Sequence, residues 1–186
     1  MSSNLTTNTI EALLFGAGRP LRLSEIRSLL ENNGIYEELP SIKISINAIE
    51  ERYENTSLEI KEVSSGYRLQ IKESFSPCLS SLWNEKAPRI SKALMETISI
   101  IAYKQPVTRG DIEDIRGVHV STSSIRSLLE REWIKVSGFR DVPGRPALYS
   151  TTKQFLDDFN MKKVSSLPDL PQPVEQDAEE FLSEVV

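Results

Sequence analysis

The basic side chains around one short loop are the groups in this sequence best suited to binding an anion or an acidic partner. Arg140 and Arg145 lie within GFRDVPGRPALYSTT (residues 138–152), and Lys135 comes just before it. Guanidinium and ammonium groups can contact the phosphates of a nucleic acid or the carboxylates of a protein. Proline and glycine fill the stretch between two apolar runs, which is typical of a stiff loop joining two strands.

Few side chains in this sequence suit catalysis, metal binding or cofactor binding. His119 and Cys78 are the single histidine and cysteine, and they are far apart in the chain, so they predict neither a metal site nor a Cys–His pair. The carboxylate pairs at 37–38 and 50–51 lie in polar stretches typical of solvated surfaces. Neither a phosphate-binding glycine loop nor a dinucleotide fingerprint is present. We therefore expect a protein without enzymatic activity or a cofactor.

The composition is that of an ordinary globular protein, with 39% hydrophobic and 26% charged residues. The first seven residues lack the features of a secretory signal, and no apolar run approaches the roughly 20 residues of a membrane helix. A soluble cytoplasmic protein is expected. The net charge of -5 is unevenly distributed: residues 88–164 hold 13 basic and 9 acidic residues, whereas residues 165–186 hold six acidic and no basic residues.

An internal repeat with an offset of 86 residues organises the chain. Pro20-Leu21 corresponds to Pro106-Val107, and Glu25-Ile26 corresponds to Asp111-Ile112. These matches keep a helix, a turn led by proline and a second helix in register. The sequence therefore predicts the same structural unit twice.

The first copy shows helical spacing of apolar residues, followed by alternation. Three helices are predicted, then a hairpin that turns at Ser64-Ser65-Gly66, and then a closing helix that begins at Ser76-Pro77. The apolar residues on which these elements depend are Ile10, Leu13, Leu14, Ala17, Ile26, Leu29, Leu30, Ile42, Ile46, Ile49 and Tyr53 for the three helices, Leu58, Ile60, Tyr67, Leu69 and Ile71 for the hairpin, and Leu79, Leu82 and Trp83 for the closing helix.

The second copy carries clearer helix boundaries. Ser91 and Ser121 are predicted N-caps, Thr108 and Asp111 have the spacing of a capping box, and Gly117 is predicted to end a helix. Two strands are expected over residues 134–138 and 147–151. Leu94, Ile98, Ile101 and Ala102 form the apolar stripe of the first helix, Ile112 and Ile115 are expected to point inward, and the third helix carries Ile125, Leu128 and Leu129.

Three short helices followed by a β-hairpin are typical of the winged helix-turn-helix, in which the hairpin forms the wing. We therefore expect an α+β, mainly helical chain with two tandem winged helix-turn-helix domains, at residues 1–87 and 88–164. Residues 165–186 are rich in proline and then acidic, which predicts a disordered tail. The alternative for this tail is a docking segment that uses Phe181, Leu182 and Val185.

The charges on the predicted third helices bear on the choice of partner. The third helix of the first unit is net negative, and that of the second unit, with Arg126 and Arg131 against Glu130 and Glu132, is neutral. A domain that reads DNA usually presents a basic stripe on this element. The pattern therefore favours docking to a protein, while a winged-helix DNA-binding transcriptional regulator is the alternative.

Two long stretches closely resemble the segregation and condensation protein B (ScpB) family. They are ALMETISIIAYKQPVTRGDIEDIRGV (93–118) and LLEREWIKVSGFRDVPGRPALYSTTKQFLDDF (128–159), while IEALLFGAGRPLRLSEI (10–26) fits the family's opening more loosely. Glu132 departs from the pattern, because the family commonly has glycine there. His119 also occupies a position where a small residue is expected.

This resemblance implies a non-enzymatic protein that forms a homodimer through its N-terminal domain and needs no cofactor. The implied partner is the kleisin subunit ScpA, which bridges the head domains of the SMC ATPase in a nucleoid complex that condenses and segregates the chromosome. At most weak, nonspecific DNA contact and no membrane contact are expected.

Residues in the matched motifs with polar or aromatic character are the candidate partner-binding residues. Aromatic side chains beside arginine are common anchors of interfaces. Trp133 is a further aromatic candidate, and packing in a core or hairpin is the alternative for each aromatic residue. The candidate set is Tyr103, Arg116, Phe139, Arg140 and Arg145.

Overall fold

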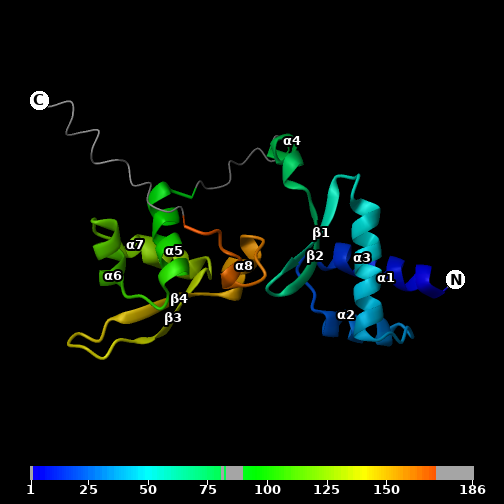
Figure 1. The fold of residues 1–186 in the computed structure, drawn as a ribbon, viewed down its shortest axis with the longest axis horizontal. Helices are drawn as coiled ribbons and strands as arrows, with labels where there is room; N and C mark the ends of the chain where they lie inside the picture. The colour runs from blue at the N-terminus through cyan, green and yellow to red at the C-terminus, as the bar shows by residue number, and fades with distance from the viewer. Residues whose placement is uncertain (1, 81, 83–89, 171–186) are drawn as a thin grey trace, which may run out of the picture.

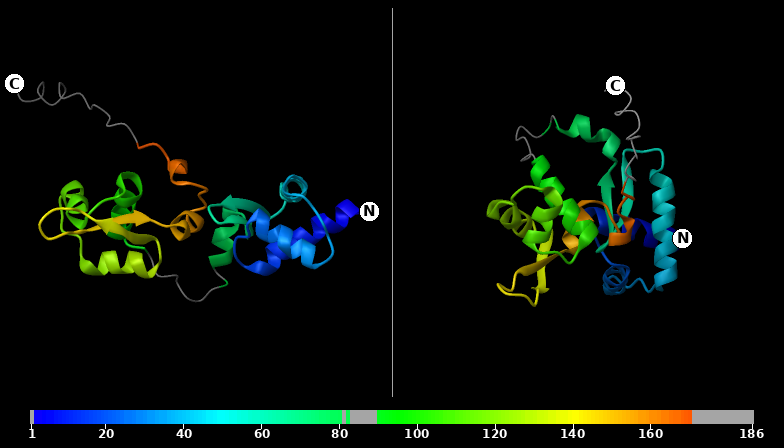
Figure 2. Two further views of the ribbon diagram at one scale, coloured as in Figure 1. Left: turned by 90° about the horizontal axis from the view of Figure 1, so that it is seen from below. Right: turned by 60° about the vertical axis from the view of Figure 1, so that its left-hand side comes forward.

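The computed structural model describes residues 2–80, 82 and 90–170, and these form two helix-and-hairpin units that lie end to end (Figures 1 and 2). The first unit contains α1 (Ser2–Ala17), α2 (Leu23–Asn32), α3 (Leu39–Tyr53), β1 (Leu58–Val63), β2 (Gly66–Ile71), a 3-10 turn (Glu73–Phe75) and α4 (Ser76–Ser80). The second unit contains α5 (Lys92–Lys104), α6 (Arg109–Arg116), α7 (Thr122–Glu130), β3 (Ile134–Phe139), β4 (Ala147–Thr151), α8 (Lys153–Asp158) and a 3-10 turn (Val164–Ser166).

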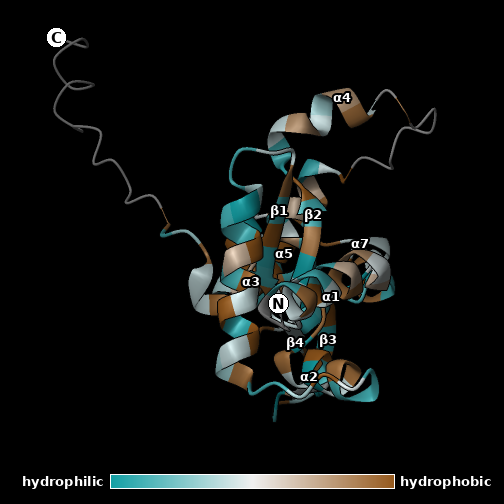
Figure 3. Ribbon diagram, turned by 90° about the vertical axis from the view of Figure 1, so that its right-hand side faces the viewer, coloured by the Kyte–Doolittle hydropathy of each residue, from teal (hydrophilic) through white to brown (hydrophobic). Residues whose placement is uncertain are grey.

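The core of the first unit is built from the apolar stripes of three helices and from the inner face of one hairpin. Figure 3 shows hydrophobic and hydrophilic residues in turn along α3, as expected for a helix with one buried face. The buried residues are Ile10, Leu14, Leu21, Ile26, Leu30, Ile42, Ile46, Ile49, Ile60 and Tyr67. The three helices predicted from the spacing of these residues are confirmed as α1, α2 and α3.

The β1–β2 hairpin is held against the segment between α1 and α2. Leu21 and Tyr67 exchange two backbone hydrogen bonds of 2.8 Å. Gly66 makes this approach possible: its φ is +139°, and a Cβ there would lie 2.1 Å from the carbonyl oxygen of Leu21. The second unit repeats the arrangement, because Val107 bridges Tyr149 of β4. In each unit, the segment between the first two helices therefore pairs with the second strand of the hairpin, as the sequence repeat would require.

The second unit has its own core, and its helices begin and end where the sequence predicts. Ser91 and Ser121 accept hydrogen bonds as N-caps, and Thr108 and Asp111 form a reciprocal capping box. Gly117 ends α6 in the left-handed conformation. The buried residues are Leu94, Ile98, Ile101, Ala102, Val107, Ile112, Val120, Ile125, Leu128, Trp133, Ile134, Phe155 and Leu156.

The end of α7 places Glu132 in a backbone conformation that glycine adopts more easily. The amide of Trp133 donates to the carbonyl of Leu128, and the amide of Glu132 donates to that of Leu129. This pair of bonds is a Schellman motif, whose left-handed position glycine normally fills. Glu132 occupies it with a φ of +57°. The helix exit is therefore the one that glycine would form, and glutamate adopts it at some cost in backbone energy.

The closing helix of the first unit does not pack as predicted. No residue of α4 is buried, and Leu82 is 71% exposed. In Figure 1, α4 lies beyond the end of the hairpin rather than over the core. This helix contributes no buried residue to either core. Trp83 and the predicted domain boundary at residue 87 lie outside the described residues.

The turn of the first hairpin contacts α8 and the residues that follow it. The amide of Ser64 donates to the carbonyl of Met161 at 3.0 Å, and the amide of Ser65 donates to Oδ1 of Asp157 at 2.9 Å. Asp157 is only 6% exposed, and Val63 is 2% exposed although it belongs to neither core. The two units therefore share a small packed contact, which the views in Figures 1 and 2 both show.

Ordered contacts continue past residue 164, where the sequence predicts the start of a disordered tail. Leu167 packs against the second core, and the carbonyl of Pro168 accepts a hydrogen bond from Tyr103. The apolar side chain at 167 has a hydrophobic surface available, so the prediction of disorder is wrong for this first part of the tail. Residues 171–186 lie outside the described residues.

Candidate partner-docking surface

The β3–β4 hairpin is fixed to the start of α6 by an arginine. Both terminal nitrogens of Arg140 donate to the carboxylate of Asp111, at 2.8 and 2.6 Å. These bonds and a further one from the amide of Thr108 hold the pKa of Asp111 well below its usual range, at about 2. Arg140 therefore positions the hairpin, and both of its terminal nitrogens are already engaged within the protein.

The outer part of the same hairpin is apolar and exposed. Phe139 is 60% exposed, and Val136 and Val142 are each nearly half exposed. Arg145 lies at the tip with an exposed side chain, and no ion pair holds it among the described residues. An exposed aromatic ring beside an arginine that lacks an ion pair is an arrangement suited to docking a protein segment.

Tyr103 and Arg116 lie on helices of the second unit and not on the hairpin. The hydroxyl of Tyr103, on α5, donates to the carbonyl of Pro168 at 2.6 Å. The side chain of Arg116, on α6, is 10% exposed and pairs with Glu96 at 2.9 Å. The five predicted residues therefore divide into Phe139, Arg140 and Arg145 on the hairpin, and two residues that already make internal contacts.

Trp133 belongs to the second core. It is 5% exposed, its indole nitrogen donates to Asp158 at 2.7 Å, and its ring packs edge-on against Phe159. The alternative of core packing is therefore confirmed for this residue.

A groove between α5 and α6 was not anticipated from the sequence. It has a volume of about 570 Å³ and is lined by Lys92, Met95, Glu96, Ser99, Ile100, Ile115 and Arg116. The prediction that Ile115 points inward is wrong, because its side chain is 54% exposed while Ile112 is fully buried. Met95 and Ile100 lie off the predicted core stripe of α5. The presence of these two apolar residues outside the stripe could have indicated a second apolar face on this helix.

Several arginines of the second unit are engaged in internal ion pairs. Arg126 pairs with Glu130 at 2.8 Å on α7, the third helix, and Arg109 pairs with Glu113 at 3.1 Å on α6. Neutralised side chains contribute little to the field that attracts phosphates. The described part of the unit therefore lacks a basic stripe on its third helix.

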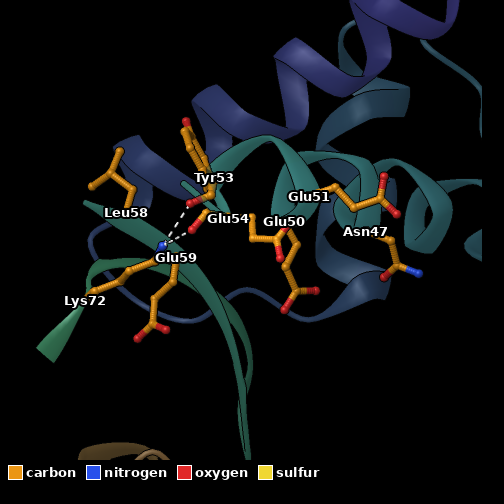
Figure 4. Close-up of a pocket in the computed structure, with 8 residues that line it drawn as sticks. All are labelled: Asn47, Glu50, Glu51, Tyr53, Glu54, Leu58, Glu59 and Lys72. Atoms are coloured by element: carbon orange, nitrogen blue, oxygen red, sulfur yellow. Dashed lines mark hydrogen bonds between the residues drawn. The ribbon is translucent and has the colours of Figure 1, made fainter. Parts of the chain in front are cut away.

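The third helix of the first unit is acidic where it ends. Figure 4 shows Glu50, Glu51 and Glu54 around a pocket beside the end of α3. The amine of Lys72 donates to the carbonyls of Tyr53 and Glu54, at 3.0 and 2.6 Å, so this cation satisfies the helix C-terminus. The acidic face would repel nucleic acid.

The single histidine and the single cysteine lie on different units of the described structure. His119 is exposed and contacts Glu113 at 2.9 Å, and Cys78 is exposed on α4. No three His, Cys, Asp or Glu side chains within residues 2–80 and 90–170 are grouped so as to hold a metal ion. None of the helices in these ranges is both long and apolar enough to span a bilayer.

Exposed apolar side chains also gather on the helices of the first unit. Leu5 and Phe15 of α1 are 61% and 74% exposed, and Ile44 of α3 is 68% exposed. Tyr36, just before α3, is 81% exposed. Side chains of this kind are available to a protein partner where they form one patch.

The fold is that of an α+β protein with two small cores, each made of helices and one hairpin. Both units also expose large apolar side chains. Residues 8–170 match the family model described as segregation and condensation complex subunit ScpB. The chain belongs to the ScpB family.

Relatives of this chain carry the family's name. A segregation and condensation protein B homolog from Coxiella burnetii is 47% identical over 167 residues, which are 89% of this chain and 79% of the relative. The segregation and condensation protein B of Clostridium tetani is 40% identical over 175 residues, which are 93% and 90% of the two chains.

Solved structures of the family are also similar. The crystal structure of ScpB from Mycobacterium tuberculosis is 23% identical with a TM-score of 0.40, covering 84% of this chain and 96% of that one. A dimer of an ScpB N-terminal domain complexed with an ScpA peptide is 27% identical with a TM-score of 0.37, covering 44% and 92%.

Proposed function

We propose that this protein is a non-enzymatic accessory subunit of an SMC–kleisin complex that condenses and segregates the chromosome at the nucleoid. In this proposal, residues 1–87 and 88–164 are two winged helix-turn-helix domains. The first forms a homodimer, and the second binds the kleisin ScpA, which links the subunit to the SMC ATPase. Membership of the ScpB family and the repeated order of three helices and a hairpin support it.

One observation carries the preference for a protein partner. The hairpin of the second unit presents exposed apolar side chains, while Arg140 on the hairpin and Arg126 on the third helix are paired with carboxylates of the same unit. A kleisin segment with apolar side chains and a carboxylate would bury Phe139 and pair with Arg145. Arg140 would contribute by holding the hairpin in place.

The exposed apolar face of the first unit is the proposed dimer interface. A stable dimer needs roughly 1,200–2,000 Å² of buried surface, with large apolar side chains at its centre. Phe15 and Ile44 are suited to that position because they are large and mostly exposed. Replacing Phe15 with glutamate should shift the full-length chain from dimer to monomer in sedimentation velocity. A monomeric wild-type chain at micromolar concentration would contradict this part of the proposal.

Calorimetric titration of the full-length chain with purified ScpA tests the proposed function. Phe139→Ala combined with Arg145→Ala should weaken binding at least tenfold, because both side chains are exposed on the hairpin. The matched control is Arg126→Ala combined with Leu129→Ala on α7, which should change the affinity less than twofold. Unchanged binding by the hairpin variant would remove these residues from the site.

Titration of the same chain with duplex DNA separates the proposal from the regulator alternative. Weak or absent binding at physiological salt is expected, since the third helices lack a basic stripe. Tight, sequence-selective binding with a steep dependence on salt would contradict the proposal.

A further inference from the structure

The α5–α6 groove contains an unsatisfied polar group. Arg116 lines the groove with a side chain only 10% exposed, and its terminal nitrogens contact Glu96 at 2.9 Å and Thr97 at 3.4 Å. Its Nε is buried and has no acceptor among the described residues. A buried guanidinium N–H without an acceptor is unusual in a folded protein. The Nε itself is closed to solvent, so an occupant of the groove would meet the guanidinium only at the atoms that line the groove, and a carboxylate is the strongest acceptor for a guanidinium.

The walls of the groove are apolar as well as basic. Met95 and Ile100 contribute from α5, and Ile115 contributes from α6 with more than half of its side chain exposed. Lys92 lies at one end. An occupant that fits this surface would combine large apolar side chains with carboxylates.

The chain's own C-terminal segment has this composition. Residues 171–186 contain Glu175, Asp177, Glu179, Glu180 and Glu184 and no lysine or arginine. Phe181, Leu182, Val185 and Val186 lie among these acids. The charge also complements the second unit, in which residues 88–164 hold 13 basic and 9 acidic residues.

The segment starts from the correct face of α5. Lys92, Glu96, Ser99 and Tyr103 are separated by four, three and four residues, which places them on one face of the helix. The hydroxyl of Tyr103 holds the carbonyl of Pro168 at 2.6 Å, so the chain leaves the described structure at the end of the face that lines the groove. The far end is eleven residues along the helix, roughly 16 Å away.

The length of the segment is more than sufficient to reach the groove. An extended chain covers about 3.3 Å per residue, so about five residues span the distance. Sixteen residues follow Leu170. Tethering also raises the local concentration of the segment to about the millimolar range, which favours it over an outside partner of equal affinity.

From these observations we propose that residues 171–186 dock in the α5–α6 groove of the same chain, with Phe181 and Leu182 against Ile115 and a carboxylate on Arg116. The docked segment covers a surface that includes Arg116, one of the candidate partner-binding residues predicted from the sequence. It would therefore compete with a kleisin segment for this part of the second unit.

Disulfide trapping in the full-length chain tests the docking. In a Cys78→Ser background, Ser99→Cys in the groove is combined with Ser183→Cys in the segment. The matched control replaces Ser123, an exposed serine of α7, in place of Ser99. After mild oxidation, we expect an intramolecular disulfide in the groove pair, with at least fivefold the yield of the control. Equal yields would overturn the proposal, and a disulfide between two chains would assign the groove to a second copy.

Two further variants keep the test independent of the added cysteines. Phe181→Ala with Leu182→Ala, and separately Ile115→Glu, should reduce the disulfide yield to that of the control. In the chain without added cysteines, the double alanine variant should also accelerate amide exchange in α5 and α6. Unchanged yield or unchanged exchange would refute the docking. Since no kleisin is present in these assays, their failure would leave the proposed function standing.

Discussion

Replacing Asp111 with asparagine should remove the ion pair that fixes the β3–β4 hairpin while keeping the helix cap. An asparagine side chain can still accept the hydrogen bond from the amide of Thr108, but it cannot pair with the guanidinium of Arg140. The loss of stability in this variant therefore reports mainly on the ion pair. The structure gives two ways to judge its magnitude.

The first estimate comes from the pKa of Asp111, which the hydrogen bonds from Arg140 and Thr108 lower from 3.8 to about 2. A shift of this size corresponds to at most about 2.4 kcal/mol, and the partial exposure of both side chains, 28% and 42%, reduces it. The second estimate is the roughly 0.2–1 kcal/mol typical of an exposed pair. We expect Asp111→Asn to cost about 1–2 kcal/mol at pH 7.

The dependence of this cost on pH identifies its origin. Because the folded pKa is depressed, the contribution of Asp111 is complete well above pH 4 and declines as the pH falls towards 2. At pH 3 the difference between wild type and variant should be about half its value at pH 7. Other carboxylates titrate in both proteins and cancel in this difference.

Urea denaturation in a Trp83→Phe background measures the effect, because Trp133 is then the single tryptophan and lies in the second core. The control is Glu130→Gln, which breaks an exposed pair with Arg126 and should cost no more than about 0.5 kcal/mol at either pH. A cost for Asp111→Asn that is the same at pH 7 and pH 3 would refute the assigned role of the ion pair.

Three other substitutions test the backbone and the contact between the units. Gly66→Ala should destabilise the protein by about 2–4 kcal/mol in urea denaturation, since its Cβ would meet the carbonyl of Leu21. The control Gly16→Ala in α1, where space is open, should be neutral or stabilising. Equal effects of the two substitutions would contradict this prediction. Glu132→Gly should raise stability by about 0.5–1 kcal/mol by relieving its positive φ, and a loss would contradict the assigned Schellman motif. Asp157→Ala should speed hydrogen exchange of the Ser65 amide about tenfold by NMR, and unchanged exchange would argue against the contact.

The sequence predicts those parts of the fold that depend on local signals. Helical spacing located the helices of both cores, and the side chains of Ser91, Thr108 and Ser121 marked three helix starts. The prediction failed for Ile115 because α6 has only eight residues, and two apolar positions three apart do not show how far the buried face extends. Local patterns also favoured a packed closing helix at α4, but they do not determine where a helix lies relative to the core, and no residue of α4 is buried.

The candidate site depends on contacts between distant residues, which local patterns do not encode. Arg140 and Asp111 are 29 residues apart, and Tyr103 and Pro168 are 65 apart. The sequence therefore identified Arg140 as a basic residue of the hairpin but not as a residue held by the start of α6. The sequence also could not distinguish Phe139 from Trp133, because both are aromatic residues of adjoining segments. The structure shows that Phe139 is exposed and Trp133 is buried.

Size-exclusion chromatography with light scattering of the full-length chain, alone and mixed with purified ScpA, tests the central proposal most directly. We predict that the chain alone has the mass of a dimer, and that the mixture elutes as a heavier complex containing both proteins. Two separate peaks with unchanged masses would contradict the proposed kleisin-binding role.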